Sequence, residues 1–412
     1  MSSQADPVDT PHAAIAAIHA LMDGARNTQL VYVAAKLGLA DVLYDGPRYS
    51  DDIAAELGVN ALVLRRLLRG LVNRGLVAEE RAGAFSLTAV GQYLRAGAPG
   101  ALREHAIRSG EVQYPALGSL LYAVETGQSA FEHAHGTDFW DYLAANTEVN
   151  NSFNEGMTVR AEAIVDEIVS AYDFSPFARI VDVGGGAGVL LSRILEVHSA
   201  STGIVYDIPA ITQKASAYLA RRGLSGRAEV IAGDFFAAVP RGDLLVLMAV
   251  LHAWDNERAA LILRQCRKAL EPNGRVLIIE DLLPGKVDGG MRLIETDLSM
   301  LVIHNGQVRT LAEHEELLVR EGFRLESVNE TRSFDTLITA SAAPELCRNA
   351  RSTAAGRPRP CGGRRLVRWR GATGWNGTGT TTIQVRCCRG GWNSCRGTCA
   401  LSSIMLPPGR YG

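Results

Sequence analysis

The chain reads R-I-V-D-V-G-G-G-A-G-V-L between Arg179 and Leu190, which places four glycines directly after a short apolar run. The apolar run predicts a buried strand, and the apolar residues from Val189 to Val197 predict a helix. Glycine adopts positive φ and has no Cβ, so this arrangement leaves bare backbone for a ligand at the carboxyl edge of a parallel sheet. The segment therefore predicts a nucleotide-binding turn, or else a turn at which a helix simply packs closely.

The spacing of the glycines separates two classes of cofactor. A dinucleotide fingerprint counted from Gly184 needs a third glycine at the position of Val189. The chain instead reads D-x-G-x-G-x-G, in which Asp182, Gly186 and Gly188 complete the pattern. This pattern resembles the first motif of S-adenosylmethionine-dependent methyltransferases, and S-adenosylmethionine is the cofactor that we expect.

Carboxylates follow the next two predicted strands. Asp207 ends the run V-Y-D and lies 23 positions after Gly184, about the distance at which an acidic residue accepts ribose hydroxyls. Asp234 follows a third strand in G-D-F-F, where it is placed to accept from the exocyclic amine of adenine while Phe235 stacks on the ring. A lone aspartate before a helix is more often an N-cap or turn residue, but the ordered succession of strand ends favours a cofactor site.

A histidine and a glutamate follow the fourth and fifth predicted strands. The strand from Asp243 to Leu251 runs into His252, whose imidazole has an ordinary pKa of about 6.5 and can act as a general base toward a hydroxyl. The strand from Arg275 ends at Glu280, which is expected to lie beside this imidazole and hold its tautomer. A histidine merely packed at a strand end is the alternative interpretation.

The order V-D-V-G-G-G, Y-D-I-P, G-D-F-F, V-L-H-A-W-D-N-E and G-R-V-L-I-I-E-D resembles the small-molecule O-methyltransferases related to plant caffeate methyltransferases and bacterial polyketide-tailoring enzymes. The resemblance covers about residues 12 to 341. It implies an S-adenosylmethionine-dependent enzyme of secondary metabolism or antibiotic biosynthesis, with a small aromatic, phenolic acceptor. The catalytic residues that it implies are His252 and Glu280. The cofactor-binding residues that it implies include Gly184, Gly186, Asp207, Asp234 and Phe235.

Two departures from the family pattern concern the base. The family usually reads H-D-W, whereas Ala253 replaces that aspartate here. A second flanking glutamate usually stands in a K-E-R-T segment, and this chain has Val308 at that position. We therefore expect a less firmly oriented and less basic imidazole. Some relatives lack the histidine and work by proximity, so the alternatives are a weak base or a catalytically impaired methyltransferase-like protein.

The acceptor pocket is expected between two helices. Phe153 and Met157 lie one turn apart and are expected to line it, with Arg160 near the carboxylate of the cofactor. Core packing of the apolar pair and a surface ion pair of the arginine are the alternative interpretations. By resemblance, the segment Met291 to His304 forms the second wall, with a face that includes Asp297, Met300 and His304.

The amino-terminal residues 12–100 predict a winged-helix domain. A helix capped by Ser50 and a second helix capped by Asn60 precede a predicted hairpin. Arginines on the second helix would suit a DNA-binding, ligand-sensing regulator. However, residues 1–343 carry 30 Lys and Arg against 43 Asp and Glu, and this net negative charge opposes binding to phosphates. The resemblance implies homodimerisation through this domain instead.

The remaining chain divides into three segments. Residues 101–172 predict a helical connector that contributes to the acceptor pocket, and residues 173–343 predict a doubly wound, Rossmann-like α/β domain. Residues 344–412 hold 12 arginines, one acid and six of the seven cysteines. This composition predicts disorder, a translated wrong frame or an unrelated appendage, and the cysteine spacing predicts no metal site.

Composition bounds the class of protein. The chain has 412 residues, of which 47% are hydrophobic, enough for two domains and a tail. Cys266 is the one cysteine before the tail, which favours a reducing, cytoplasmic location. No run of about 18 uncharged apolar residues occurs, so no membrane span is expected.

Overall fold

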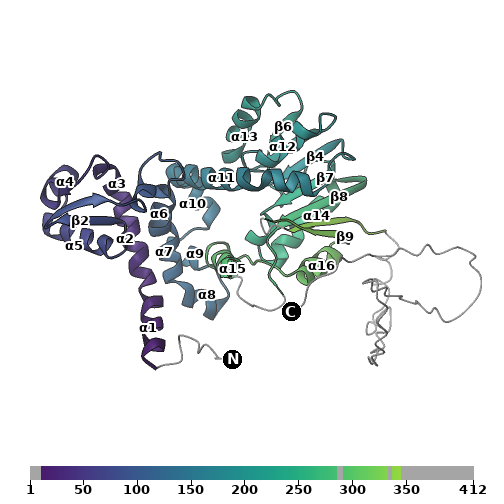
Figure 1. The fold of residues 1–412 in the computed structure, drawn as a ribbon. Helices are drawn as coiled ribbons and strands as arrows, with labels where there is room; N and C mark the ends of the chain where they lie inside the picture. The colour runs from purple at the N-terminus through teal and green to yellow at the C-terminus, as the bar shows by residue number, and fades with distance from the viewer. Residues whose placement is uncertain (1–10, 285–290, 333–335, 345–412) are drawn as a thin grey trace, which may run out of the picture. The chain divides into compact units, whose positions relative to one another are not determined.

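The computed structural model describes residues 11–284, 291–332 and 336–344 (Figure 1). These described residues all belong to one compact unit. The predicted disorder of the tail concerns residues that, apart from Pro344, lie outside the described part of the chain. None of the described helices combines the length and the apolar character that crossing a membrane requires.

A mostly parallel sheet of seven strands forms the centre of the carboxyl-terminal part. The strand order is β6-β5-β4-β7-β8-β10-β9, parallel from β6 to β8 and antiparallel at β10 and β9. Because the chain runs outward from β4 in both directions, the carboxyl ends of β4 and β7 form a topological switch point. The strands are β4 (Arg179–Val183), β5 (Thr202–Asp207), β6 (Ala228–Ala232), β7 (Gly242–Met248), β8 (Leu270–Glu280), β9 (Phe323–Glu330) and β10 (Thr336–Ala342).

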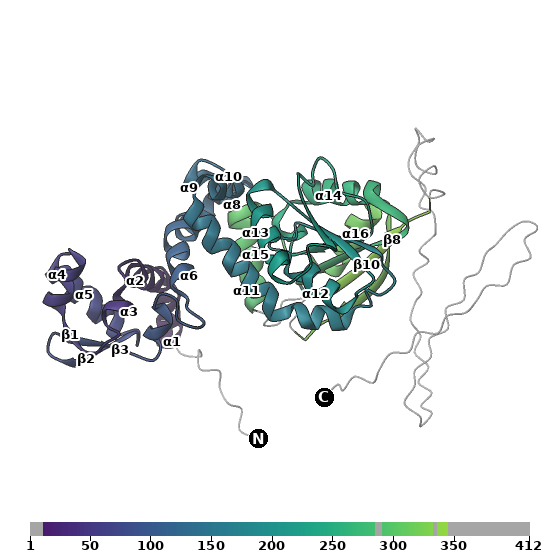
Figure 2. The same cartoon turned by 90° about the horizontal axis from the view of Figure 1, so that it is seen from above.

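Helices cover both faces of this sheet (Figure 2). Leu244 and Val246 of β7 belong to the hydrophobic cluster with α11 and α12, and Leu245 and Leu247 belong to the cluster with α14 and α16. Burial of both faces explains the continuous apolar runs of the strands. The predicted doubly wound α/β fold is therefore confirmed. The flanking helices are α11 (Thr147–Ala171), α12 (Val189–Val197), α13 (Pro209–Arg221), α14 (Asn256–Ala269) and α16 (Leu311–Arg320).

The amino-terminal part has the predicted order of two helices followed by a hairpin. Asn60 caps α5 as expected, since its side chain accepts from the Val63 N–H at 3.0 Å. The predicted cap by Ser50 is wrong: α4 begins at Ser50, and the residue before it is extended because Tyr49 still pairs with β3. The elements are α1 (Pro11–Met22), α2 (Gly24–Lys36), α3 (Leu39–Val42), β1 (Arg48–Tyr49), α4 (Ser50–Leu57), α5 (Ala61–Val72), β2 (Val77–Arg81), β3 (Ala84–Leu87) and the short 3₁₀ turn η1 (Gly91–Leu94).

The predicted helical connector consists of short helices that lead into α11. A π-helical turn, η2 (Ser109–Gln113), lies among these short helices. Gly110 in this turn lies so close to the ring of Tyr32 that a Cβ would stand 2.2 Å from it, which explains why a glycine is needed there. The other elements are α6 (Arg103–Arg108), α7 (Tyr114–Gly118), α8 (Leu120–Thr126), α9 (Ala130–His135), α10 (Phe139–Ala145) and, later in the chain, α15 (Met291–His304).

Candidate active site

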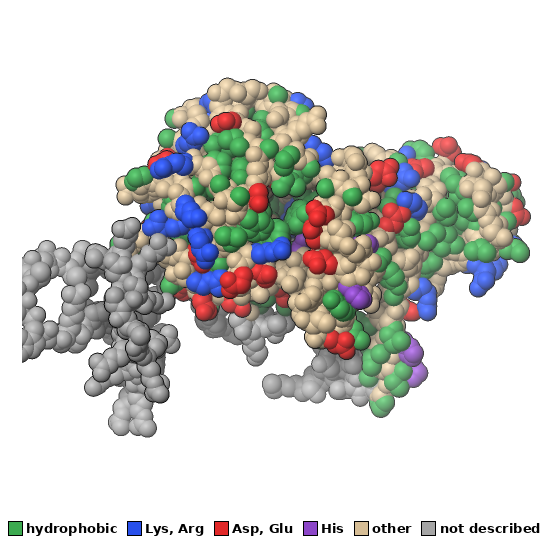
Figure 3. Space-filling view, turned by 180° about the vertical axis from the view of Figure 1, so that it is seen from behind, with side chains coloured by type: hydrophobic (Ala, Val, Ile, Leu, Met, Phe, Trp, Pro, Cys, Tyr) green, Lys and Arg blue, Asp and Glu red, His purple; other side chains and the backbone are tan. Residues whose placement is uncertain are grey.

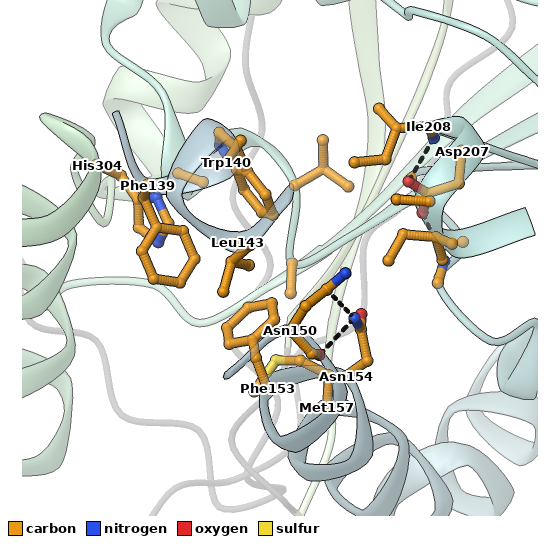
Figure 4. A pocket seen from close by; sticks show the side chains of 18 of the residues that line it. Phe139, Trp140, Leu143, Asn150, Phe153, Asn154, Met157, Asp207, Ile208 and His304 are labelled. Carbon is orange, nitrogen blue, oxygen red and sulfur yellow. Dashed lines mark hydrogen bonds between the residues drawn. The ribbon is translucent and has the colours of Figure 1, made fainter. Parts of the chain in front are cut away.

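A cavity of about 670 Å³ lies at the carboxyl ends of β4, β5 and β7. Helices α10 and α11 and the end of α15 close it on the other side (Figure 4). Figure 4 shows Asp207 and Ile208 across the cavity from Phe139 and His304. One cavity therefore joins the strand-end side of the sheet to an aromatic side made by helices.

The glycine turn after β4 lines this cavity. Gly184, Gly186 and Gly188 have φ values of 71°, 57° and 79°, in the left-handed region that glycine tolerates. A Cβ on Gly184 would stand 2.9 Å from Val250 Cγ2, whereas a Cβ on Gly186 would meet nothing within 4 Å. The turn thus needs glycine both for its backbone conformation and for close packing, and it leaves backbone open to the cavity.

Two carboxylates lie at the ends of β4 and β5. Asp207 lines the cavity and accepts two backbone N–H groups, from Gly186 at 2.8 Å and from Ile208 at 2.7 Å. Asp182 is buried beneath the turn, and one of its oxygens has no hydrogen-bond partner among the described residues. Burial and the neighbouring charge of Asp207 raise the pKa of Asp182 to about 7. This side of the cavity is consequently suited to a ligand with positive charge.

The segment after β6 brings a third carboxylate and an aromatic ring to the same cavity. Asp234 lines the cavity, and its Oδ1 accepts from the Phe236 N–H at 2.8 Å. The ring of Phe235 lies edge-on to those of Phe236 and Trp254, with centroids 4.9 and 6.1 Å apart. The three strand ends that the sequence singles out therefore converge on one cavity.

His252 occupies the short 3₁₀ turn η3 (Leu251–Ala253) after β7 and is 8% exposed. It is not among the described residues that line the cavity, although the next residue, Ala253, is. Its Nδ1 has no hydrogen-bond partner in the described part of the chain. Burial, followed by the charges of Arg160 and other basic groups, lowers the pKa of His252 to about 3.

The expected hydrogen bond between Glu280 and the His252 imidazole is corrected. Glu280 Oε1 instead accepts the backbone N–H of His252 at 3.0 Å, and its Oε2 lies 3.5 Å from His314 Nε2. The reason is the parallel pairing of β7 and β8, which sets the end of β8 against the backbone of the turn rather than against the ring. Burial raises the pKa of Glu280 to about 7.

Arg309 is a residue of this site that the sequence reasoning missed. Its side chain is fully buried, and its guanidinium donates to the carbonyls of Leu251 at 2.9 Å and Trp254 at 2.8 Å. The segment Q-V-R-T was considered only for Val308, whose side chain is buried. A cationic residue directly after Val308, in a segment already compared with the family, was the available signal.

Aromatic side chains form the wall opposite the strand ends. His304 stacks on Trp140 with centroids 5.4 Å apart and meets Phe139 edge-on at 4.7 Å. Phe153 packs edge-on against Phe139 at 5.3 Å, and Met157 also lines the cavity. Burial lowers the pKa of His304 to about 4, so its ring is neutral near pH 7. Four rings thus present flat, mostly apolar surface to the cavity.

Two asparagines of α11 also line the cavity and were missed by the sequence reasoning. Asn154 Nδ2 donates to the Asn150 carbonyl at 2.7 Å (Figure 4). Their spacing from Phe153 and Met157 on one helix was the available signal. They add amide groups to a wall that is otherwise aromatic.

Two residues of the predicted second wall lie elsewhere. Asp297 is not among the lining residues, because its Oδ1 accepts the Val308 N–H at 2.8 Å. Met300 does not line the cavity either, and α15 contributes Ile303 and His304. Arg160 does line it, with its guanidinium 3.6 Å from the carboxylate of Asp281.

Comparisons with known proteins agree with this geometry. The family model for the O-methyltransferase domain matches residues 118–324, and the model for the O-methyltransferase dimerisation domain matches residues 19–97. Phenazine O-methyltransferase PhzM from Lysobacter antibioticus is 40% identical over 316 residues, which are 76% of this chain and 92% of that protein. The 2,7-dihydroxy-5-methyl-1-naphthoate 7-O-methyltransferase from Streptomyces carzinostaticus is 36% identical over 302 residues, 73% of this chain and 90% of that protein.

A solved structure adds bound ligands to the comparison. The O-methyltransferase NcsB1 from neocarzinostatin biosynthesis was solved with S-adenosylmethionine and 2-hydroxy-5-methyl naphthoic acid. It matches with a TM-score of 0.70 and 33% identity, over 77% of this chain and 96% of that one.

Proposed function

Because this chain belongs to the family of S-adenosylmethionine-dependent O-methyltransferases, we propose that it methylates a phenolic hydroxyl of a small aromatic metabolite. The enzyme class and the cofactor follow from the family, and the acceptor is our inference. The observation that carries it is one cavity that joins the glycine turn and strand-end carboxylates to a wall of aromatic rings.

The strand-end side is proposed to hold the cofactor. Backbone of Gly184 and Gly186 would contact it, while Asp207 would accept the ribose hydroxyls. Asp234 and Phe235 would bind adenine by accepting its amine and stacking on the ring. The arginine at position 160, which lines the same cavity, would face the carboxylate of the cofactor. S-adenosylmethionine supplies an electrophilic methyl group on a positively charged sulfur.

The aromatic wall is proposed to position the acceptor. A planar ring stacked beside Trp140 and His304, with Phe153 and Met157 below it, would have few orientations open to it. Holding an oxygen in line with a reacting methyl group can contribute about 7–11 kcal/mol, by analogy with well-oriented intramolecular reactions. Positioning is therefore the larger part of the catalytic effect that we assign to this chain.

We assign proton removal from the hydroxyl to His252, and we assign it the smaller part of the catalytic effect. Its ring is neutral near pH 7 and so has a free electron pair to accept the proton. Because its pKa is so low, the imidazole has little driving force to accept the proton. This agrees with the sequence, in which Val308 replaces the second glutamate of the family pattern. Glu280 would support this role through the backbone of His252.

The chain is proposed to form a homodimer through the amino-terminal domain. The dimerisation-domain match covers residues 19–97. Helix α1, which overlaps the start of this match, exposes large apolar side chains (Figure 3). They are Ile15, Ile18, Leu21 and Met22. We propose domain limits of 12–100, 101–172 and 173–343. Light scattering of the eluting protein would test the dimer, and a monomer at micromolar concentration would contradict it.

Calorimetric titration of S-adenosylhomocysteine into the full-length chain tests the cofactor site. We expect micromolar binding at one site per chain. Incubation with S-adenosylmethionine and a hydroxyphenazine or a hydroxynaphthoate, followed by mass spectrometry, then tests the acceptor class. A gain of one methyl group on the hydroxyl is expected from at least one of them. A folded protein that binds the cofactor product but methylates no phenol would overturn the acceptor proposal.

A further inference from the structure

Every residue of the turn that carries His252 is buried. Leu251 is fully buried, and His252, Ala253 and Trp254 are at most 8% exposed. Buried backbone carbonyl and N–H groups need hydrogen-bond partners, because leaving one unpaired is destabilising. The partners of this turn therefore decide where the imidazole lies.

A single side chain satisfies the carbonyls on both sides of His252. Arg309 Nη1 donates to the Leu251 carbonyl at 2.9 Å, and its Nη2 donates to the Trp254 carbonyl at 2.8 Å. Its Nε donates to Asn256 Oδ1 at 3.0 Å, in the first turn of α14. One planar guanidinium thus fixes the turn and the helix that follows it, which the single ammonium group of a lysine cannot reproduce.

The segment that carries this arginine lies directly against the same turn. A Cβ on Gly306 would stand 2.3 Å from the His252 carbonyl oxygen, so this close contact exists only because the residue is glycine. The segment is held at two neighbouring residues: the Val308 N–H donates to Asp297 at 2.8 Å, and the Arg309 carbonyl accepts the Leu283 N–H at 3.1 Å. The strap formed by residues 306–309 is therefore a fixed support rather than a loose loop.

We propose that Arg309 is the positioning residue for His252. Together with Gly306 and Glu280, it holds the backbone of the turn from three sides and so determines where the imidazole lies. Among the described residues, His252 Nδ1 has no hydrogen-bond partner that could position the ring directly. The inference rests on the proposed role of His252. It also gives Asp297 a function, as the anchor of the strap.

Charged and titratable groups face the imidazole from every element packed around it. The basic groups are Arg160 of α11, His304 of α15, Arg309 of the strap and His314 of α16. The carboxylate is Glu280 of β8, which accepts the backbone N–H of His252 rather than contacting the ring. Arg309 is fully buried, and this burial lowers its pKa, while the negative charge of Glu280 opposes that shift. The charge of Arg309 in turn favours the neutral form of the imidazole. Loss of the guanidinium should therefore change both the position and the titration of His252.

The test compares Arg309→Met and Arg309→Lys with a matched pair, Arg227→Met and Arg227→Lys. Arg227 also donates to backbone carbonyls, but it stands just before β6, at the amino ends of the parallel strands, whereas His252 follows the carboxyl end of β7. The carbonyls are those of Leu195, His198, Ser199 and Ser201. Histidine ring signals of the labelled, full-length proteins are followed by NMR between pH 5 and 9. The His252 signal is identified by its loss in His252→Gln.

In the wild-type chain and in both Arg227 variants, the His252 signal should keep its position and not titrate. In Arg309→Met the signal should shift from its wild-type position, with a smaller shift in Arg309→Lys. If Arg309→Met fails to fold, Gly306→Ala provides the same comparison, with an expected shift of the His252 signal. A His252 signal at its wild-type position in a folded Arg309 or Gly306 variant would overturn the proposal.

S-adenosylhomocysteine titrated into the same samples separates this inference from the proposed function. We expect its Kd to change by less than about threefold in the Arg309 variants, because Arg309 does not line the cavity. With a phenolic acceptor, kcat should fall by up to roughly 30-fold in Arg309→Met, no more than expected for loss of His252 itself, and stay within about twofold in Arg227→Met. If the wild-type chain binds no S-adenosylhomocysteine, the proposed function fails, while the NMR comparison still decides the role of Arg309.

Discussion

Replacing His252 by alanine tests how much proton removal contributes to methyl transfer. Burial and the nearby charges of Arg160 and Arg309 lower the pKa of His252 to about 3. Placing a proton on this ring at pH 7 therefore costs about 5 kcal/mol, since each pKa unit corresponds to about 1.36 kcal/mol. General bases with a pKa near the working pH typically contribute about 10²- to 10⁴-fold. We expect a smaller effect here, a fall in kcat of about 3- to 30-fold.

Cofactor binding should increase the contribution of His252 to kcat. If the carboxylate of the cofactor pairs with Arg160, the charge that opposes protonation of His252 is partly neutralised. The pKa of the imidazole then rises toward its ordinary value, and its effect as a base increases. For this reason kcat is measured with saturating S-adenosylmethionine, and the Kd of S-adenosylhomocysteine is measured separately by calorimetry.

The assay uses full-length wild-type, His252→Ala and His252→Gln proteins with one phenolic acceptor. The glutamine variant keeps much of the side-chain volume, so a difference between the two variants reports packing rather than proton transfer. A kcat within about twofold of wild type in both variants would refute the role as a base. A fall beyond about 1000-fold would refute the reasoning from the low pKa, and a tenfold weaker binding of S-adenosylhomocysteine would make His252 a cofactor contact instead.

Three further predictions concern the cofactor site, its electrostatics and the buried histidines. Asp207→Ala should weaken S-adenosylhomocysteine binding by about 10- to 100-fold, because hydrogen bonds to a charged group contribute about 1.5–3 kcal/mol; calorimetry measures this, and an unchanged Kd would mean that the ribose lies elsewhere. Binding of cationic S-adenosylmethionine at pH 7 should release part of a proton from Asp182, whose pKa is raised to about 7; titrations in two buffers of different ionisation enthalpy would then differ, and Asp182→Asn should remove the difference. Burial lowers the pKa of His314 to about 4. As the pH falls from about 6.5 to 4, this histidine is therefore protonated in the unfolded chain but not in the folded one, and the free energy of unfolding decreases. His314→Gln should reduce that loss by up to about 1.4 kcal/mol per pH unit in urea unfolding, and an unchanged slope would contradict the assignment.

The sequence by itself determined the fold class and the strand-end side of the cavity. Gly184, Asp207 and Asp234 each follow an apolar run that forms a strand, and parallel neighbouring strands bring their carboxyl ends to one edge. These features are local in sequence, and the order of the strands converts them into one cavity. The cap at Asn60 was predictable for the same reason, because a cap is a contact between residues three positions apart.

The tertiary structure alone decided what surrounds His252. Glu280 contacts the backbone of His252 from 28 positions away, and Arg309 reaches Leu251 from 58 positions away, so neither contact follows from a local pattern. Likewise, helical spacing put Asp297 on the predicted wall, but its bond to Val308 took it out of the cavity. The direction in which a buried side chain points depends on which partner satisfies its polar atoms after packing, and the sequence does not specify that partner.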